Sequence, residues 1–321
     1  MVGIAQMVEH LVVVQDVAGS SPVTHPTEIR RNETPAVRLW RNPFEAIPMN
    51  HPTQPWRRYV ALGDSLSEGL ADFDADGRPR GWADRLAQGL ADRCGEDVGY
   101  ANLAIRGRLI HPILAEQVEP ALALKPDLVS LWGGGNDLLR PDADPDEMAA
   151  AVESAVITLR DSGADVLIGL GVDPKDSPII KLTRKRVAIY NLNLATLAAR
   201  HGARVVNTWG MRSLRDWRMW DADRLHLNSE GHHRVAQAAL VSLGLDPDSP
   251  DWDSPLPPQA PMTRRETLDW NLAWCRNDLA PWLGRRIRRT SSGQGREPKH
   301  ATYHLVSPGG GHPADTGQQA Q

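Results

Sequence analysis

The chain has very few cysteines. Only Cys94 and Cys275 occur among 321 residues, and neither stands in a spacing such as C-x-x-C. Two cysteines are too few for a disulfide scaffold, and their spacing argues against a cysteine-based zinc site. This usage is typical of a reducing compartment, so we expect a cytoplasmic protein.

Long apolar runs and a strong charge of one sign are also missing. No run of about 18 apolar residues exists to form a membrane-spanning helix. Hydrophobic residues make up 41% and charged residues 24% of the chain, which is typical of a soluble globular protein. The net charge is -4, so no overall positive field favours nucleic acid as a partner.

The first 48 residues show no regular pattern. Leu11–Val14 is apolar, but it is too short for a signal peptide and no basic region precedes it. The run from Met1 to about Pro26 resembles a peptide read from the wrong strand of a transfer-RNA gene. Residues 1–48 are therefore either a non-native start, with Met49 as the true first residue, or a disordered arm.

From Arg58 onward, apolar segments of strand length alternate with longer segments of helical periodicity. This alternation predicts an α/β protein with a parallel sheet, in one domain at 56–245. Asp144 and Asn228 stand where they can cap the helices that follow them. The predicted strands are 59–62, 98–105, 128–132, 166–170 and 204–206.

The C-terminal part of the chain has a different composition and periodicity. Residues 246–262 are rich in Pro, Asp and Ser, which predicts a linker. Thr263 and Glu266 form a capping box that opens an amphipathic helix, predicted at 263–289. This helix either packs on the domain, which its apolar face favours, or makes weak peripheral contact with a membrane. Residues 290–321 lack periodicity and are predicted to be a disordered tail.

Polar and glycine-rich segments follow four of the five predicted strands. Ligands of open parallel sheets bind beyond the carboxyl ends of the strands, so these segments are expected to meet at one site. They are GDSLSEG at 63–69, RGR at 106–108, GGND at 134–137 and DRLHLN at 223–228.

Ser65, His226 and Asp223 have the chemistry of a catalytic triad. A serine hydroxyl needs a base to take its proton, and the base needs a third group to hold its tautomer. Asp223 lies three residues before His226, so one turn can bring its carboxylate to the ring. Simpler interpretations also exist: Ser65 could only cap a helix, and Asp223 with His226 could be a solvated loop pair.

An oxyanion formed at this site would need hydrogen-bond donors. The backbone N–H groups of Ser65 and Gly107 and the side-chain amide of Asn136 are the expected donors. Gly107 could instead only permit a tight turn of the backbone, and Asn136 could only cap the helix that follows the glycine run. Arg106 and Arg108 flank Gly107, and substrate recognition and ion pairing explain them equally well.

Residues 223–228, which carry Asp223 and His226, are named here the triad loop. Three tryptophans precede this loop in the sequence: Trp209, Trp217 and Trp220. Such residues could border a substrate pocket, but packing in the core is the favoured explanation. The substrate-binding residues are not predicted.

Together the four segments resemble the conserved blocks of the SGNH (GDSL-type) hydrolases. Ser65, Gly107, Asn136 and His226 match the four residues that give the family its name, in the family's order. The resemblance covers about residues 58–243. It implies a three-layer α/β/α sandwich, flavodoxin-like, with a five-stranded parallel sheet in the order 2-1-3-4-5. It also assigns Asp64 and Asp137 to holding loop geometry.

The resemblance implies a serine esterase that needs no metal and no cofactor. Its substrate would be a small-molecule carboxylic ester, such as a short acyl ester, an acetylated carbohydrate or a lysophospholipid, cleaved through an acyl-enzyme. The absence of a G-x-S-x-G motif argues against the α/β-hydrolase fold. An acyltransferase with the same triad and a non-catalytic binding module remain alternatives, and the oligomeric state is not predicted.

Overall fold

The structure, a computed structural model, describes residues 56–74, 76–177, 180–260, 262–279 and 292–310. The chain divides into two compact units, Met1–Leu39 and Trp40–Gln321, and all described residues belong to the second unit. The predictions for residues 1–48, 280–289 and 311–321 lie outside the described residues.

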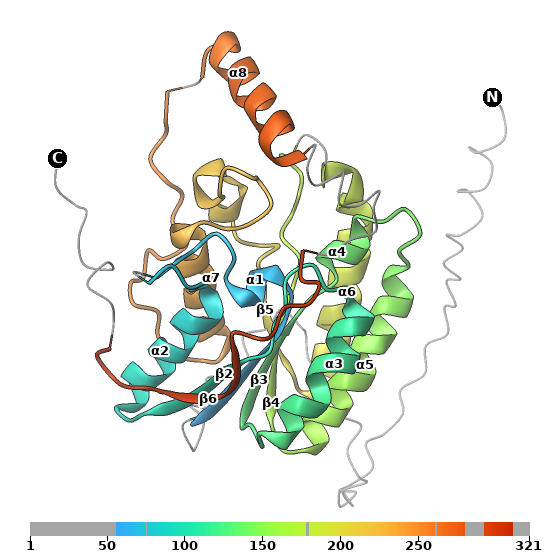
Figure 1. The fold of residues 1–321 in the computed structure, drawn as a ribbon, viewed down its shortest axis with the longest axis vertical. Helices are drawn as coiled ribbons and strands as arrows, with labels where there is room; N and C mark the ends of the chain where they lie inside the picture. Colours follow the sequence, from blue (N-terminus) through green and yellow to red (C-terminus); the bar gives the residue numbers. More distant parts are fainter. Residues whose placement is uncertain (1–55, 75, 178–179, 261, 280–291, 311–321) are drawn as a thin grey trace, which may run out of the picture. The chain divides into compact units, whose positions relative to one another are not determined.

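A central sheet runs through the second unit (Figure 1). Its strand order is β5-β4-β3-β1-β2-β6. The first five strands are parallel, so the expected order 2-1-3-4-5 is confirmed. The strands are β1 (Arg58–Gly63), β2 (Val98–Asn102), β3 (Leu128–Trp132), β4 (Asp165–Gly169), β5 (Arg204–Val206) and β6 (His300–Val306).

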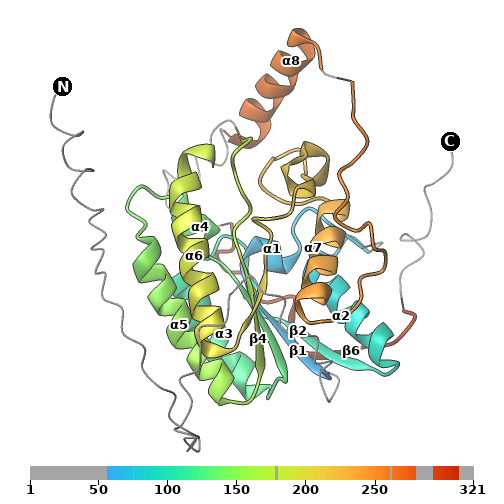
Figure 2. The ribbon, with the colours of Figure 1, turned by 180° about the vertical axis from the view of Figure 1, so that it is seen from behind.

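Helices cover both faces of the sheet, which gives the three-layer sandwich (Figures 1 and 2). α2 and α7 pack together on one face, and α3, α5 and α6 pack on the other. Short helices α1 (Ser65–Glu68) and α4 (Gly135–Leu138) follow β1 and β3. The long helices are α2 (Trp82–Cys94), α3 (Ile110–Ala123), α5 (Pro145–Asp161), α6 (Arg184–His201) and α7 (Ser229–Ser242).

Burial and capping explain why these segments adopt these elements. Every residue of β2 and β3 is buried, as expected for parallel strands covered on both faces. The Asp144 side chain accepts hydrogen bonds from the first turn of α5, and Asn228 accepts one from Gly231 in α7. Each cap satisfies backbone N–H groups that have no partner within their own helix.

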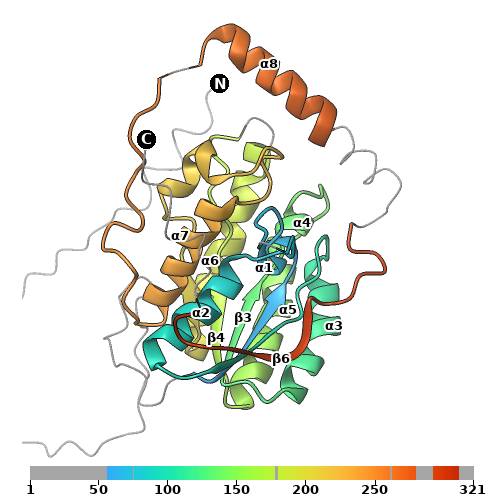
Figure 3. The same cartoon turned by 60° about the vertical axis from the view of Figure 1, so that its left-hand side comes forward.

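The sheet has six strands rather than the five expected, and the sixth corrects the prediction for the C-terminal tail. β6 lies within 290–321, the segment predicted to be disordered, and it pairs antiparallel with β2 (Figure 3). β2 would otherwise be an edge strand, and edge strands expose unpaired N–H and C=O groups. The His300 and His304 rings also pack against Tyr100 of β2.

A further helix, α8 (Arg264–Trp274), begins at the expected capping box of Thr263 and Glu266. It continues as a π-helical stretch at Cys275–Leu279. In the described part of 246–262, before α8, no helix or strand is formed.

Candidate active site

The chain turns sharply at Gly63, where β1 ends and Ser65 begins α1. Gly63 has a φ of 148°, and a Cβ there would lie 2.2 Å from the Trp132 carbonyl oxygen. Gln117 fixes the turn, because its amide accepts from the Gly63 N–H at 2.8 Å and donates to the Gly63 carbonyl at 2.9 Å. Ser65 is therefore carried by backbone that is anchored in the sheet.

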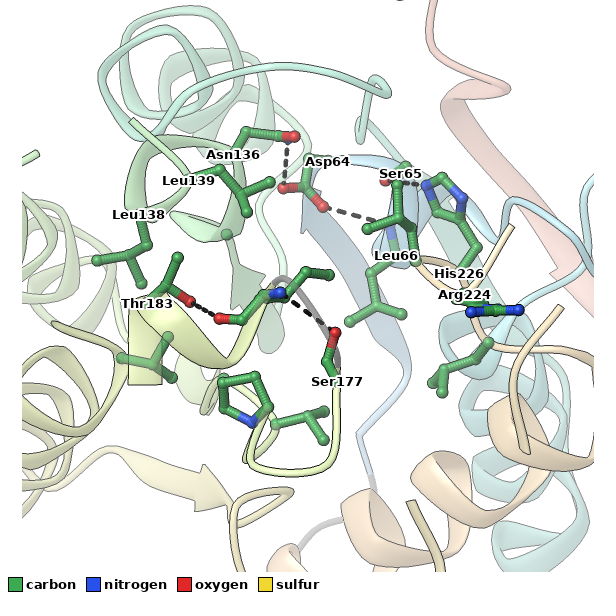
Figure 4. A pocket seen from close by; sticks show the side chains of 18 of the residues that line it. Asp64, Ser65, Leu66, Asn136, Leu138, Leu139, Ser177, Thr183, Arg224 and His226 are labelled. Carbon is green, nitrogen blue, oxygen red and sulfur yellow. Dashed lines mark hydrogen bonds between the residues drawn. The ribbon is translucent and has the colours of Figure 1, made fainter. Parts of the chain in front are cut away.

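A chain of hydrogen bonds links Asp223, His226 and Ser65. His226 Nε2 lies 3.0 Å from Ser65 Oγ (Figure 4). On the other side of the ring, His226 Nδ1 lies 2.5 Å from Asp223 Oδ2. Asp223 Oδ1 also accepts from the backbone N–H groups of Leu225 and His226 at 2.9 and 3.0 Å. One carboxylate thus shapes the turn and orients the ring, as the three-residue spacing predicted.

The charge state of Asp223 suits this arrangement. Its burial acts to raise the pKa. The hydrogen bond to His226, the charge that this ring carries when protonated, and two backbone N–H groups together outweigh burial, so the pKa of Asp223 is lowered. An ionised Asp223 holds the proton of a neutral His226 on Nδ1, which leaves Nε2 as an acceptor toward Ser65.

Gly107 and Asn136 line the same cavity as Ser65 and His226. Gly107 adopts a φ of 73°. Asn136 Nδ2 donates to Asp64 Oδ2 at 3.1 Å and to the Arg108 carbonyl at 3.0 Å. The three residues expected to supply oxyanion donors thus line one cavity, and the Asn136 amide is engaged by its neighbours.

Two buried carboxyl groups brace these loops. Asp64 caps α1 by accepting from the Leu66 N–H at 3.2 Å, and burial raises its pKa to about 6. Asp137 accepts from the Ile110 N–H at 3.0 Å, and burial raises its pKa as well. Both side chains tie one loop of the site to another, in agreement with the role that the family resemblance implied.

The cavity around Ser65 has a volume of about 1190 Å³. On the side toward α4 and α6, apolar side chains line it together with polar ones (Figure 4). The apolar residues on this side include Leu66, Leu138, Leu139, Ile180 and Val187.

Ion pairing accounts for the two arginines beside Gly107. Arg106 forms a mostly buried ion pair with Glu68, and Arg108 lies 2.9 Å from Glu116. Of the three tryptophans before the triad loop, Trp217 and Trp220 border the cavity. Trp209 instead packs against the core on the α5–α6 side of the sheet.

Sequence reasoning missed one group of cavity residues. Asn277, Ser292 and Arg296 lie in the C-terminal part of the chain, yet they line the cavity together with the triad. No motif marks them, and the Gly-rich composition around 292–296 resembles that of a flexible tail.

The described part of the chain has neither a metal-ligand group nor a membrane-spanning helix. Its His, Cys, Asp and Glu side chains form no group of three or more that could hold a metal ion. Its helices include none with the length and apolarity needed to span a bilayer.

Fold and site together define an SGNH-type hydrolase. Residues 61–234, more than half of the chain, match the GDSL-like lipase/acylhydrolase family. The protein belongs to this family and is a carboxylic ester hydrolase by class.

Individual relatives agree with this assignment. The spore germination lipase LipC of Bacillus licheniformis is 26% identical over 200 residues, which cover 56% of this chain and 93% of that protein. The crystal structure of TesA is similar at 25% identity and a TM-score of 0.50, covering 58% of this chain and 98% of that one. LAE5, an α/β hydrolase enzyme from the metagenome of Lake Arreo in Spain, shares the fold at 21% identity and a TM-score of 0.51, covering 59% and 95%.

Proposed function

We propose that the protein is a serine esterase that cleaves small-molecule carboxylic esters through an acyl-enzyme intermediate. Ser65 is the nucleophile, His226 is the general base and then the general acid, and Asp223 orients His226. The observation that carries this proposal is the hydrogen-bond chain from Asp223 through His226 to Ser65.

In the first half-reaction, Ser65 Oγ attacks the ester carbonyl carbon while His226 Nε2 takes the hydroxyl proton. The carbonyl oxygen becomes an oxyanion, stabilised by the N–H groups of Ser65 and Gly107 and by the Asn136 amide. To reach it, Asn136 has to share or exchange one of its present hydrogen bonds. The C–O bond then breaks, and the alcohol leaves with the proton from His226.

In the second half-reaction, water attacks the acyl carbon. His226 takes the proton of the water and returns it to Ser65 Oγ as the carboxylic acid leaves. No redox step and no co-reactant other than water enters this scheme.

The apolar side chains on the α4 and α6 side of the cavity favour an acyl chain longer than acetyl. Burial of a methylene group contributes roughly 0.8 kcal/mol, so chain length is a direct probe of this side. With p-nitrophenyl esters from acetate to octanoate, kcat/KM is expected to rise with acyl length and then level.

Substitution of Ser65 tests the proposal. Ser65→Ala is expected to lower kcat for p-nitrophenyl ester hydrolysis on the order of 10⁴-fold or more, because the nucleophile is removed. Ser67→Ala is the matched control, since this buried serine lies in the same short helix and its hydroxyl has no hydrogen-bond partner among the described residues. Wild-type rates in Ser65→Ala would exclude the proposed mechanism.

A further inference from the structure

The C-terminal segment, defined here by its described residues 264–279 and 292–310, lies outside the family match at 61–234. It nevertheless contacts the two loops that carry the proposed catalytic groups. Three of its residues also line the cavity. These contacts raise the question of whether the segment takes part in catalysis.

The first contact reaches the triad loop through Trp274. Its indole Nε1 donates to the backbone carbonyl of Asp223 at 2.9 Å, and the side chain is only 9% exposed. The same residue, Asp223, holds His226 Nδ1 through its carboxylate. Trp274 therefore fixes the backbone of the residue that orients the proposed base.

The second contact reaches the same loop through Arg224, which lies between Asp223 and His226 in the sequence. Arg224 is 4% exposed, and its guanidinium lies 3.4 Å from the ring centroid of Trp270 and 4.7 Å from that of Trp274. It also donates to Asn271 Oδ1 at 2.9 Å. Its φ of 57° is uncommon for a residue with a side chain, and such conformations persist where the surrounding contacts hold them.

The third contact reaches the loop that carries Gly107. Gly293 lies so close to this loop that a Cβ would stand 2.0 Å from the Arg106 carbonyl oxygen. Lys299 donates to the Glu68 carbonyl at 2.7 Å, and the Glu68 carboxylate accepts from the Arg106 N–H at 2.7 Å. The segment therefore supports the oxyanion side of the site as well as the triad side.

We propose that the C-terminal segment is a positioning element of the active site. Trp274, together with Trp270 through Arg224 of the loop, holds the triad loop in the geometry that points His226 at Ser65. Gly293 holds the loop of Gly107 toward the developing oxyanion. This inference rests on the proposed function. It explains why α8 buries Trp274 while Leu268 and Leu272 on the same helix remain 58% and 59% exposed.

Trp274→Phe in the full chain tests the triad contact. Phenylalanine keeps an aromatic ring beside Arg224 but removes the hydrogen-bond donor to Asp223. We expect kcat to fall about tenfold with KM within about twofold, because small misplacements of a reacting group reduce turnover steeply. Leu272→Ala is the matched control, since it changes an exposed side chain of the same helix.

Gly293→Ala tests the oxyanion contact. Its added Cβ has to displace the backbone at Arg106, so kcat is expected to fall about tenfold or more while KM changes little. The control is Gln294→Ala at the neighbouring exposed position. For every variant, titration of the reactive serine with a fluorophosphonate gives kcat per folded site, so a loss of folded protein does not imitate a loss of turnover.

Reduced kcat in both variants, with both controls at wild-type values, supports the inference. An unchanged kcat in Trp274→Phe overturns the positioning role for the triad loop. An unchanged kcat in Gly293→Ala overturns it for the loop of Gly107. The proposed function is tested separately: inactive Ser65→Ala together with fully active Trp274→Phe and Gly293→Ala would refute the positioning role alone.

Discussion

Residues 63–65, named here the nucleophile turn for the role proposed for Ser65, face the triad loop (residues 223–228) across one 3.0 Å contact. The two are held in different ways. The nucleophile turn is anchored in the sheet, where both backbone polar groups of Gly63 bond to Gln117 of α3. The triad loop lies beyond β5, and the C-terminal helix supports it through Trp274. The difference suggests that changes near Ser65 disturb stability and activity together, whereas changes around the triad loop mainly disturb activity.

Among the substitutions that compare these two regions, Asp223→Asn in the triad loop is expected to have the largest effect. The amide keeps the size of the side chain but removes the charge that stabilises protonated His226 and can select the wrong tautomer. We expect kcat to fall by roughly 10³- to 10⁴-fold with little change in the free energy of unfolding. Steady-state kinetics and urea unfolding measure the two quantities.

Asp221→Asn is the control for that substitution, because Asp221 is an exposed acid two residues earlier in the same loop. It should keep near wild-type turnover. The reverse pattern, with Asp221→Asn inactive and Asp223→Asn active, would contradict the assignment of the triad.

Asn136→Ala, on the nucleophile side, is expected to have the next largest effect. Loss of one oxyanion donor typically lowers kcat by about 100- to 1000-fold, with a smaller effect on KM because the oxyanion exists only beyond the ground state. Asn136 also bonds Asp64 and the Arg108 carbonyl, so this variant should be less stable as well. An effect confined to KM would remove Asn136 from the oxyanion hole.

The smallest effect concerns His232, a buried residue of α7 below the nucleophile turn. Its Nδ1 accepts from the Trp82 N–H at 3.1 Å, and burial lowers its pKa to about 3. In the unfolded chain histidine titrates near about 6.5, so between these values the unfolded state binds more protons. The contribution of His232 to the free energy of unfolding therefore falls as the pH drops from about 6.5 toward 3, by up to about 1.4 kcal/mol per pH unit.

Urea unfolding of wild type and His232→Gln between pH 7 and pH 5 measures this contribution. Asp64 has a raised pKa of about 6, so its contribution to the free energy of unfolding changes in the opposite direction between about pH 6 and its unfolded pKa. Both proteins contain Asp64, so the difference between their pH dependences reports on His232. The variant should lose less stability on acidification. Equal slopes would show that His232 does not remain neutral in the fold.

Local patterns made most of the fold, and the contact between Asp223 and His226, predictable. Each parallel strand carries its own apolar run, and Asp223 and His226 lie on one turn, so their contact follows from a spacing of three residues. Contacts between distant segments left no such signal. The pairing of Val98 with Val306 and the bond from Trp274 to Asp223 join segments whose partners no short pattern specifies.

The composition of the C-terminal part also gave no indication that this part contacts the site. Glycine and polar residues near 292–296 are typical of a disordered tail, but here Gly293 is the residue that allows close approach to Arg106. The hydrogen bond between Asn136 and Asp64 was likewise unforeseen, because it depends on how two loops from different strands meet.

The proposed mechanism depends on Ser65 as a nucleophile that His226 activates. Reaction of the full chain with a fluorophosphonate, followed by peptide mapping in a mass spectrometer, tests it most directly. We predict one adduct per chain, on Ser65, absent from Ser65→Ala and formed at least about 1000-fold more slowly in His226→Ala. An adduct on another residue, or an active esterase that forms no adduct, would rule out Ser65 as the nucleophile.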